Sequence, residues 1–321
     1  MALADSIMEK APLLTIAIPT YNRSSVLKES LSRILTQRKE LKNEDIIEIF
    51  VVNNASTDNT DNVIKKFIIS GENINYIVNI ENIGADRNIY KCFHLGTGKY
   101  IWVLGDDDYI LANTLQRVIH LLIENGDCGL VSLEVFPWEL KCLMKSEKKY
   151  TVYNNPRKGL RKIGWFITSI TLNIVQRAYL STAENVAKEA MKHGLTQTPY
   201  FMAAAIASKK GLMVHEKMFD GGKCEAGGYD VYEVFLDNYL SLVQKYLPGR
   251  WTYETAKFQI FPVIIGYIGG QLFRKIFFGK CKGNYRNIFD WKKVISYYWY
   301  CPYFYAFPFV LIWKAIQKII K

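Results

Sequence analysis

Apolar and amphipathic segments alternate through the first third of this 321-residue chain, and a polar loop follows each apolar segment. The apolar segments have the length and composition of buried strands and lie at 13–18, 48–52, 74–78 and 100–104. Helices are predicted between them, over about 26–37, over 60–70, and after the loop 81–88. This β-α-β-α-β-α-β order predicts a doubly wound, mostly parallel α/β sheet. Ligands of such sheets bind beyond the carboxyl ends of the strands, so the four polar loops can converge on one ligand.

The last of these loops carries three adjacent carboxylates, Asp106, Asp107 and Asp108, directly after an apolar strand. Like charges at one strand end repel, so a fold tolerates them when a cation or strong hydrogen-bond donors lie nearby. Mg²⁺ and Mn²⁺ take oxygen ligands and often bridge protein carboxylates to substrate phosphates. An isolated triplet of this kind could equally be a solvated acidic turn that caps the next helix. The three polar loops before it favour a metal site.

Several other classes of protein do not fit the sequence. Residues 96–99 lack the upstream glycine of a Walker loop, and no GxGxxG is present. The six cysteines form neither a CxxC pair nor a cluster with histidine, which argues against a zinc site or a disulfide framework. The net charge of +11 indicates an anionic partner, and no nucleic-acid-binding motif accompanies it. The N-terminal residues lack the apolar region of a signal peptide, so a cytoplasmic location is expected.

The four loops together resemble the GT-A nucleotide-diphospho-sugar glycosyltransferases of family 2. The resemblance rests on residues 18–23, 51–58 and 82–88 and on the DXD-like 105–108. It covers residues 13–120 and is closest to the abequosyltransferase-like enzymes of O-antigen assembly. It implies a GT-A domain over 1–250, with a nucleotide-binding half (13–120) and an acceptor half (121–250). The remainder, 251–321, is expected to be a helical, basic segment that associates with a membrane.

The resemblance also implies residue roles. A nucleotide-sugar donor would be bound by Pro19, Thr20, Tyr21, Arg23, Asn53, Asn54, Arg87, Asp106 and Asp107. Asp107 and Asp108 would hold a divalent Mg²⁺ or Mn²⁺ against the diphosphate. The amides at 53 and 54 can both donate and accept hydrogen bonds, which leaves CDP-, UDP- and dTDP-linked donors open. Gly105 stands where the family usually has an acid.

Four residues are candidates for the catalytic base. Family members usually carry an acidic pair before the strand predicted at 212–214, but residues 196–199 read Thr-Gln-Thr-Pro. Removal of the acceptor proton still needs a base. The remaining candidates in this half of the chain are Glu134, His193, Asp220 and Glu225. Further strands are predicted at 128–135 and 165–175, and a helix at 200–207.

The C-terminal segment differs in composition from the rest. Residues 258–273 and 294–313 are uncharged, and the second stretch contains two prolines and many Tyr and Trp residues. Lys314, Lys318 and Lys321 share one face of the expected last helix. We therefore expect this segment to lie on an anionic membrane surface, with a membrane span and plain core helices as alternatives.

The implied function is transfer of a sugar from a nucleotide donor to a hydroxyl of a polyprenyl-diphosphate-linked oligosaccharide, in bacterial O-antigen or capsule assembly. The transfer would be inverting and metal-dependent, by an enzyme bound peripherally to the inner face of the cell membrane. Direct transfer to polyprenyl phosphate is an alternative. The missing acidic pair also leaves open a catalytically silent sugar-nucleotide-binding or scaffold protein.

Overall fold

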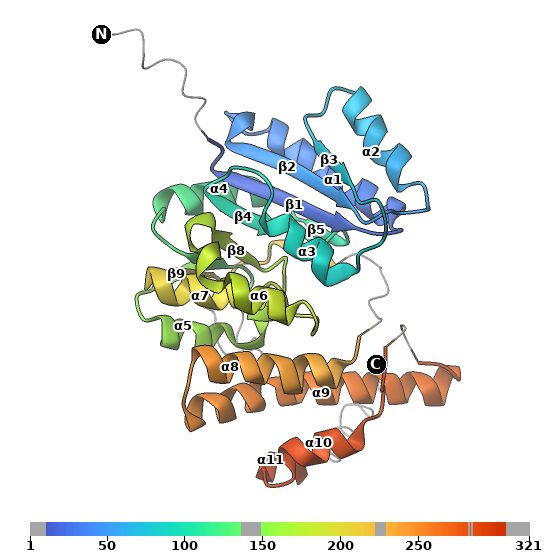
Figure 1. Cartoon of the computed structure of the whole chain (residues 1–321), viewed down its shortest axis with the longest axis vertical. Coiled ribbons are helices and arrows are strands. Elements are labelled where there is room, and N and C mark those ends of the chain that lie inside the picture. The colour runs from blue at the N-terminus through green and yellow to red at the C-terminus, as the bar shows by residue number, and fades with distance from the viewer. Residues whose placement is uncertain (1–10, 136–148, 222–228, 282, 284, 306–321) are drawn as a thin grey trace. The chain divides into compact units, whose positions relative to one another are not determined.

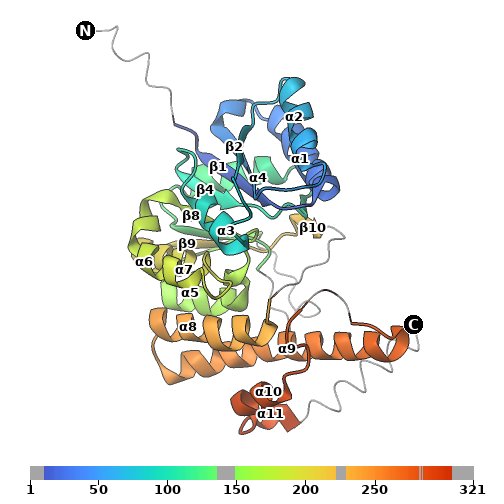
Figure 2. The ribbon, with the colours of Figure 1, turned by 45° about the vertical axis from the view of Figure 1, so that its right-hand side comes forward.

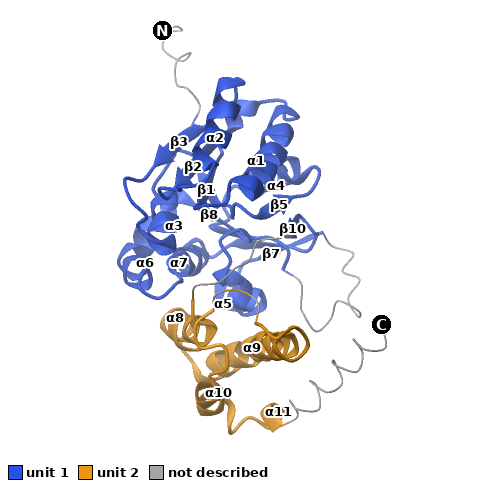
Figure 3. Cartoon of the chain, turned by 90° about the vertical axis from the view of Figure 1, so that its right-hand side faces the viewer, with its two compact units in different colours: residues 1–224 blue, residues 225–321 orange. Residues whose placement is uncertain are grey.

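A computed structural model describes residues 11–135, 149–221, 229–281, 283 and 285–305. It divides the chain into two compact units, residues 1–224 and 225–321 (Figure 3). The boundary expected at residue 250 falls within the second unit, at the first residue of its longest helix.

The first unit is built on an eight-stranded sheet in the order β3-β2-β1-β4-β8-β6-β9-β7 (Figure 1). The strands are β1 (Leu14–Thr20), β2 (Ile47–Asn53), β3 (Asn75–Val78), β4 (Tyr100–Val103), β6 (Leu130–Ser132), β7 (Tyr150–Tyr153), β8 (Asn173–Gln176) and β9 (Gly211–Val214). β1 pairs in parallel with β2 and β4, and β2 with β3, which confirms the predicted parallel half. The register sets Thr20 opposite Asn53, so two of the polar loops begin side by side.

Helices cover both faces of this sheet. They are α1 (Ser24–Lys39), α2 (Thr60–Ile69), α3 (Ala85–Phe93), α4 (Thr114–Glu124), α5 (Pro156–Ile163), α6 (Glu184–Ala190) and α7 (Thr198–Ser208). α1 and α4 lie on one face, and α3, α6 and α7 on the other (Figure 3). Fully buried residues of the central strands, including Ile16, Ile49 and Trp102, form the core against the helix faces. Burial of this apolar surface is the main stabilising contribution.

The chain after β4 turns at once into a second, small sheet. β5 (Asp108–Ile110) pairs antiparallel with β10 (Phe219–Gly221), so that Asp108 faces Gly221 and Tyr109 faces Asp220. This pairing fixes the last residue of the acidic loop to a segment more than 100 residues later in the sequence.

The prediction of a strand at 165–175 was wrong over most of its length. Residues 164–168 form a 3₁₀ helix, and a strand begins at Asn173. Local bonds explain the difference: Thr168 Oγ1 donates to the Trp165 carbonyl, and the Asn173 amide donates to the carbonyls of Phe166 and Ser169. Such side-chain bonds to nearby backbone compete with a strand ladder. The strands predicted at 128–135 and 212–214 and the helix at 200–207 are confirmed as β6, β9 and α7. β6 is shorter than predicted, at three residues.

The second unit is helical. It contains a π-helical turn (Glu233–Tyr239), α8 (Leu240–Tyr246), α9 (Arg250–Phe278), α10 (Trp291–Tyr298) and α11 (Pro302–Tyr305). α8 lies along α9 (Figure 2). Among the described residues, α9 is long and apolar enough to cross a bilayer, and 33% of its most apolar window is buried in the fold. The lysines at 314, 318 and 321 lie outside the described residues.

Candidate active site

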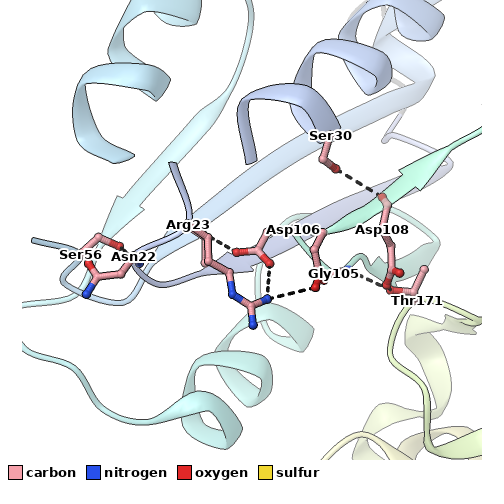
Figure 4. A network of polar contacts seen from close by, with 10 residues as sticks. Asn22, Arg23, Ser30, Ser56, Gly105, Asp106, Asp108 and Thr171 are labelled. Atoms are coloured by element: carbon pink, nitrogen blue, oxygen red, sulfur yellow. Dashed lines mark hydrogen bonds and ion pairs between the residues drawn. The ribbon is translucent and has the colours of Figure 1, made fainter. Parts of the chain in front are cut away.

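The loops after β1 and β2 are joined by hydrogen bonds into one rim. Asn22 donates its backbone N–H to Ser56 Oγ (2.9 Å), and its Oδ1 accepts from the Thr57 N–H (2.7 Å) (Figure 4). The Ser24 N–H, at the start of α1, donates to Asp58 Oδ2 (2.9 Å). Asn22 adopts a left-handed backbone (φ 53°), which asparagine tolerates better than most residues. The rim is therefore held by backbone and short polar side chains, with little freedom to move.

Buried asparagines support this rim from beneath. Asn54 Oδ1 accepts from Asn79 Nδ2 (2.9 Å) and from the Ile83 N–H (3.0 Å), while its Nδ2 donates to Asn82 Oδ1 (2.8 Å). Asn53 Oδ1 accepts from the Ser56 N–H (2.8 Å). Asn54 therefore binds the loop after β3, and Asn53 binds its own loop. Contact of either amide with a nucleobase stays a prediction. Asn79 was not predicted from the sequence, because a single asparagine after a weak strand matches no motif.

The acidic loop lies directly against this rim. Asp106 is 4% exposed and accepts from Thr20 Oγ1 at its Oδ2 (2.7 Å) and from Arg23 Nη1 at its Oδ1 (2.9 Å) (Figure 4). The same Arg23 nitrogen lies 3.4 Å from Asp107 Oδ2. Burial raises the pKa of Asp106 to about 6, although Arg23 and Thr20 act in the opposite direction. The structure thus brings together four of the predicted donor-site residues.

Asp108 is held from the other side. Thr171 Oγ1 donates to its Oδ2 (2.5 Å), and the Gly105 N–H donates to Thr171 Oγ1 (2.9 Å) (Figure 4). Burial raises the pKa of Asp108, and the Asp107 and Glu134 carboxylates raise it further. Thr171 precedes β8, 63 residues after Asp108, so no local motif could have identified it.

Two other predicted donor contacts are accessible. Tyr21 is 42% exposed, and Arg87 is exposed in the first turn of α3. Pro19 is half-buried within β1, paired with Val52 of β2. Each lies at or near the carboxyl edge of the sheet, where a nucleotide could reach it.

The base candidates occupy different surroundings. The Glu134 carboxylate accepts the backbone N–H groups of Met218 and Phe219, the latter at 2.7 Å, and so fixes the approach to β10. Asp220 forms an ion pair with Lys217. His193 lies near the carboxylate of Asp86 in α3. Glu225 lies outside the described residues.

The charges of the acidic loop suit a divalent cation. Asp106, Asp107 and Asp108 with Arg23 leave this cluster net negative, and burial already raises the pKa of two of the carboxylates. Of the two aspartates that contact Arg23, Asp107 has the more exposed side chain, at 27% against 5% for Asp106. Mg²⁺ is usually bound through one or two carboxylates plus substrate phosphates, so a complete protein cage is unnecessary. Within the described ranges, no three His, Cys, Asp or Glu side chains form such a cage.

Known proteins resemble this chain in sequence and in fold. The abequosyltransferase RfbV of Salmonella typhimurium is 38% identical over 122 residues, which cover 37% of this chain and 35% of that protein. An uncharacterized glycosyltransferase of Mycoplasma pneumoniae (MG025 homolog) is 36% identical over 107 residues, 33% of this chain and 35% of that protein. The matches thus span about a third of these relatives.

Solved structures share the fold at low identity. Staphylococcus aureus TarS (residues 1–349) superposes with a TM-score of 0.56 at 16% identity, over 80% of this chain and 79% of that one. The mannosyltransferase PcManGT of Pyrobaculum calidifontis, solved with GDP-Man and Mn²⁺, gives 0.50 at 16% identity, over 78% and 74%.

The model of glycosyl transferase family 2 matches residues 15–181, which include β1 to β4, the asparagine-supported rim and the acidic loop. Because this match covers more than half of the chain, the protein belongs to glycosyl transferase family 2 and is a glycosyltransferase with a GT-A-like fold.

Proposed function

We propose that this glycosyltransferase transfers a sugar from a nucleotide-diphosphate donor to a hydroxyl of a lipid-linked oligosaccharide during bacterial surface polysaccharide assembly. The observation that carries the proposal is the contact of the acidic loop with the β1 rim, through Thr20 and Arg23 to Asp106. This places carboxylates and a guanidinium at the carboxyl edge of the sheet, where a diphosphate would be bound. The similarity to an abequosyltransferase supports a deoxysugar donor.

The donor site divides into two parts in this proposal. Tyr21 is exposed beside the rim and can stack on a pyrimidine base. Asp107 and Asp108 would hold a Mg²⁺ or Mn²⁺ ion, as the Mn²⁺-containing structure of PcManGT suggests by analogy. When bound, such an ion would neutralise negative charge on the leaving nucleoside diphosphate. Arg23 favours the ionised form of the neighbouring Asp106, and exposed Arg87 can reach a phosphate or ribose oxygen.

The acceptor end of the proposal concerns the membrane. A lipid-linked acceptor requires the enzyme to work at a bilayer surface, on the cytoplasmic side where nucleotide sugars are present. The end of α9 supports this: Ile276, Phe277 and Phe278 are each at least 60% exposed. Arg274, Lys275 and Lys280 are close by in the sequence. Exposed apolar residues beside cations suit an anionic headgroup layer.

The proposal is tested by incubating the full-length chain with CDP-, UDP-, dTDP- and GDP-sugars and Mn²⁺, and measuring nucleoside diphosphate release. A parallel thermal-shift screen reports binding, since a bound nucleotide raises the melting temperature by mass action. One donor should give both a shift and Mn²⁺-dependent release. A shift without release, with or without acceptor extracts, would instead identify a silent sugar-nucleotide-binding protein.

A polyprenyl phosphate acceptor remains the second candidate, because α9 meets the length and apolarity of a membrane span. Radiolabelled donor supplied with polyprenyl phosphate, and separately with polyprenyl-diphosphate-linked saccharide, distinguishes the two. The proposed acceptor class is wrong if label enters lipid with polyprenyl phosphate alone.

A further inference from the structure

The N-terminus of α7 lacks the acids that family members usually carry there. Thr196, Gln197 and Thr198 are buried, and α7 begins at Thr198. The Gln197 Oε1 and Thr198 Oγ1 atoms have no hydrogen-bond partner among the described residues. This end of α7 is therefore polar but supplies no group that can accept a proton near neutral pH.

A carboxylate from another helix reaches this position. Asp86 lies in the first turn of α3, is half-buried, and accepts a hydrogen bond from the Thr196 backbone N–H. His193, in the segment between α6 and α7, lies within electrostatic range of the same carboxylate. The side chain that fills the place of the missing acids thus comes from about 110 residues earlier in the sequence.

The segment before α7 and the acidic loop both bind residues 168–171. Asp108 is bound by Thr171, and the 3₁₀ segment before Thr171 accepts the Gln197 Nε2 at the Thr168 carbonyl (2.5 Å). Gln197 follows Thr196, which binds Asp86. β6 and β9 run parallel to each other and antiparallel to β8, which is itself antiparallel to β4. The start of α7 therefore lies at the same edge of the sheet as the end of β4, and so does the start of α3.

We propose that Asp86 is the general base of the transfer, acting in place of the family's acidic pair. This inference rests on the proposed sugar transfer. As the acceptor oxygen forms its bond to the anomeric carbon, its proton passes to the Asp86 carboxylate. The bond from that carbon to the diphosphate breaks, and the nucleoside diphosphate leaves with the electron pair. The protonated Asp86 then releases its proton to water, so the enzyme returns to its starting state.

The surroundings of Asp86 suit this role. Burial raises its pKa to about 6, against the opposing effects of the Thr196 N–H and of His193. A carboxylate with a pKa near the working pH is both largely ionised and basic enough to accept a proton. His193 is a titratable group close to it on the neighbouring segment, and Arg87 is adjacent on α3 itself.

A matched control tests whether Asp86 has a purely structural role. One turn further along α3, the Tyr90 hydroxyl donates to Glu184 of α6, and His94 Nε2 lies 3.1 Å from the same carboxylate. Tyr90→Phe removes a contact between α3 and α6 without touching Asp86. If Asp86 merely docked α3, the two substitutions would have similar consequences.

The test compares wild type, Asp86→Asn, Asp86→Ala and Tyr90→Phe as full-length proteins, measuring nucleoside diphosphate release from the active donor of the panel with Mn²⁺. Asp86→Asn keeps an oxygen for the Thr196 N–H and should lower the rate about 10²- to 10⁴-fold, the range of general-base catalysis. Tyr90→Phe should stay within a few-fold of wild type. Wild-type rates should rise with pH through about 6. The rise should be shallower in Asp86→Asn, where the remaining limb belongs to Asp106.

Chemical rescue distinguishes proton transfer from positioning. Added formate should restore part of the release by Asp86→Ala, because a small carboxylate can occupy the vacated space, and should not affect Tyr90→Phe. Equal losses in Asp86→Asn and Tyr90→Phe, or an unchanged acid limb in Asp86→Asn, overturn the assignment. Failure of the proposed function looks different: wild type itself would then release no nucleoside diphosphate from any donor. A thermal shift with the nucleotide in every variant confirms that donor binding is intact.

Discussion

A methyl group on Gly105 would lie 2.7 Å from Oδ2 of Asp108, closer than a side-chain carbon approaches an oxygen in folded proteins. The same position would be 3.2 Å from Thr171 Oγ1. The absence of a side chain at 105 therefore lets the Asp108 carboxylate fold back over the loop to meet Thr171. The family usually has an acidic side chain at position 105. In this chain the carboxylate of Asp108 occupies that space instead.

Gly105→Ala should consequently displace the Asp108 carboxylate while leaving the fold intact, because the clashing atom is the end of a side chain. We expect the melting temperature to change by no more than about 2–4 °C, equivalent to about 1 kcal/mol in a domain of this size. The Mn²⁺ concentration for half-maximal nucleoside diphosphate release should rise about tenfold, as expected for loss of about 1.4 kcal/mol of binding. Unchanged Mn²⁺ dependence would exclude Asp108 from the proposed metal site.

Asp107→Ala tests the metal site from its exposed side. Because Asp107 would hold the cation against the leaving diphosphate, turnover at saturating Mn²⁺ should fall about 10²-fold or more, on the scale of losing one preorganised electrostatic contact. Asp127→Ala is a suitable control, since Asp127 is an exposed carboxylate paired with Lys210 just before β6, at the opposite edge of the sheet from the loop. Near wild-type turnover by Asp107→Ala would contradict the metal role.

The sequence predicted the parallel half of the sheet because each strand there is a mostly apolar run followed by a polar loop. The loops of the proposed donor site were grouped for the same reason, and Thr20 and Arg23 do contact Asp106, while donor binding stays a prediction. The acceptor half was harder, because its strands are three or four residues long and its backbone is held by side chains such as Asn173. Asp86 and Thr171 act across long sequence separations, and no spacing rule connects either residue to its partner.

Asp106→Asn should stabilise the first unit at neutral pH while impairing catalysis. The pKa of Asp106 is about 6 in the folded chain and 3.8 in its ordinary state, so the folded form binds this proton more tightly. Its contribution to stability is therefore present below about 4 and lost as the pH rises through about 6. Asparagine has no charge to bury, so the variant does not lose this stability as the pH rises. The missing ion pair with Arg23 offsets part of the gain in stability. We expect a net gain on the order of 1 kcal/mol at pH 8.

Urea unfolding of wild type and Asp106→Asn at pH 5 and pH 8 checks this prediction. The difference in free energy of unfolding should favour the variant more at pH 8 than at pH 5. A difference that is independent of pH would mean that Asp106 is ionised as easily in the folded chain as in the unfolded one.

Lys257 should be essential to the stability of the second unit. The residue is 1% exposed. Its ammonium lies 4.2 Å from the Tyr300 ring centroid, 5.4 Å from that of Tyr298, and 3.5 Å from Glu254 Oε2. Desolvated cation–π contacts are each worth about 2 kcal/mol, so Lys257→Met should destabilise the unit by about 2–4 kcal/mol. Lys245→Met, at an exposed position of α8 in the same unit, is the control. Equal unfolding midpoints of the two variants by circular dichroism would show that the aromatic contacts contribute little.

The exposed end of α9 should determine membrane binding. Ile276, Phe277 and Phe278 are consecutive, so they project about 100° apart around the helix, and one flat protein groove could not cover all three. A lipid headgroup layer can surround such a helix end, and nearby cations favour anionic lipid. Replacing all three residues by serine should therefore lower co-sedimentation with vesicles containing phosphatidylglycerol about tenfold or more, and wild type should bind pure phosphatidylcholine vesicles weakly.

Ile68→Ser with Ile69→Ser is the matched control, since these residues form an exposed apolar pair on α2 in the other unit, and this variant should bind as wild type does. Extraction of the chain from vesicles distinguishes surface docking from a membrane span. A chain docked on the surface is released from vesicles by alkaline carbonate, because its contacts are limited to the interface, whereas a spanning α9 needs detergent. Release by carbonate, together with loss of binding in the triple variant alone, is the expected result. Retention of the triple variant on anionic vesicles would place the membrane contact elsewhere in the chain.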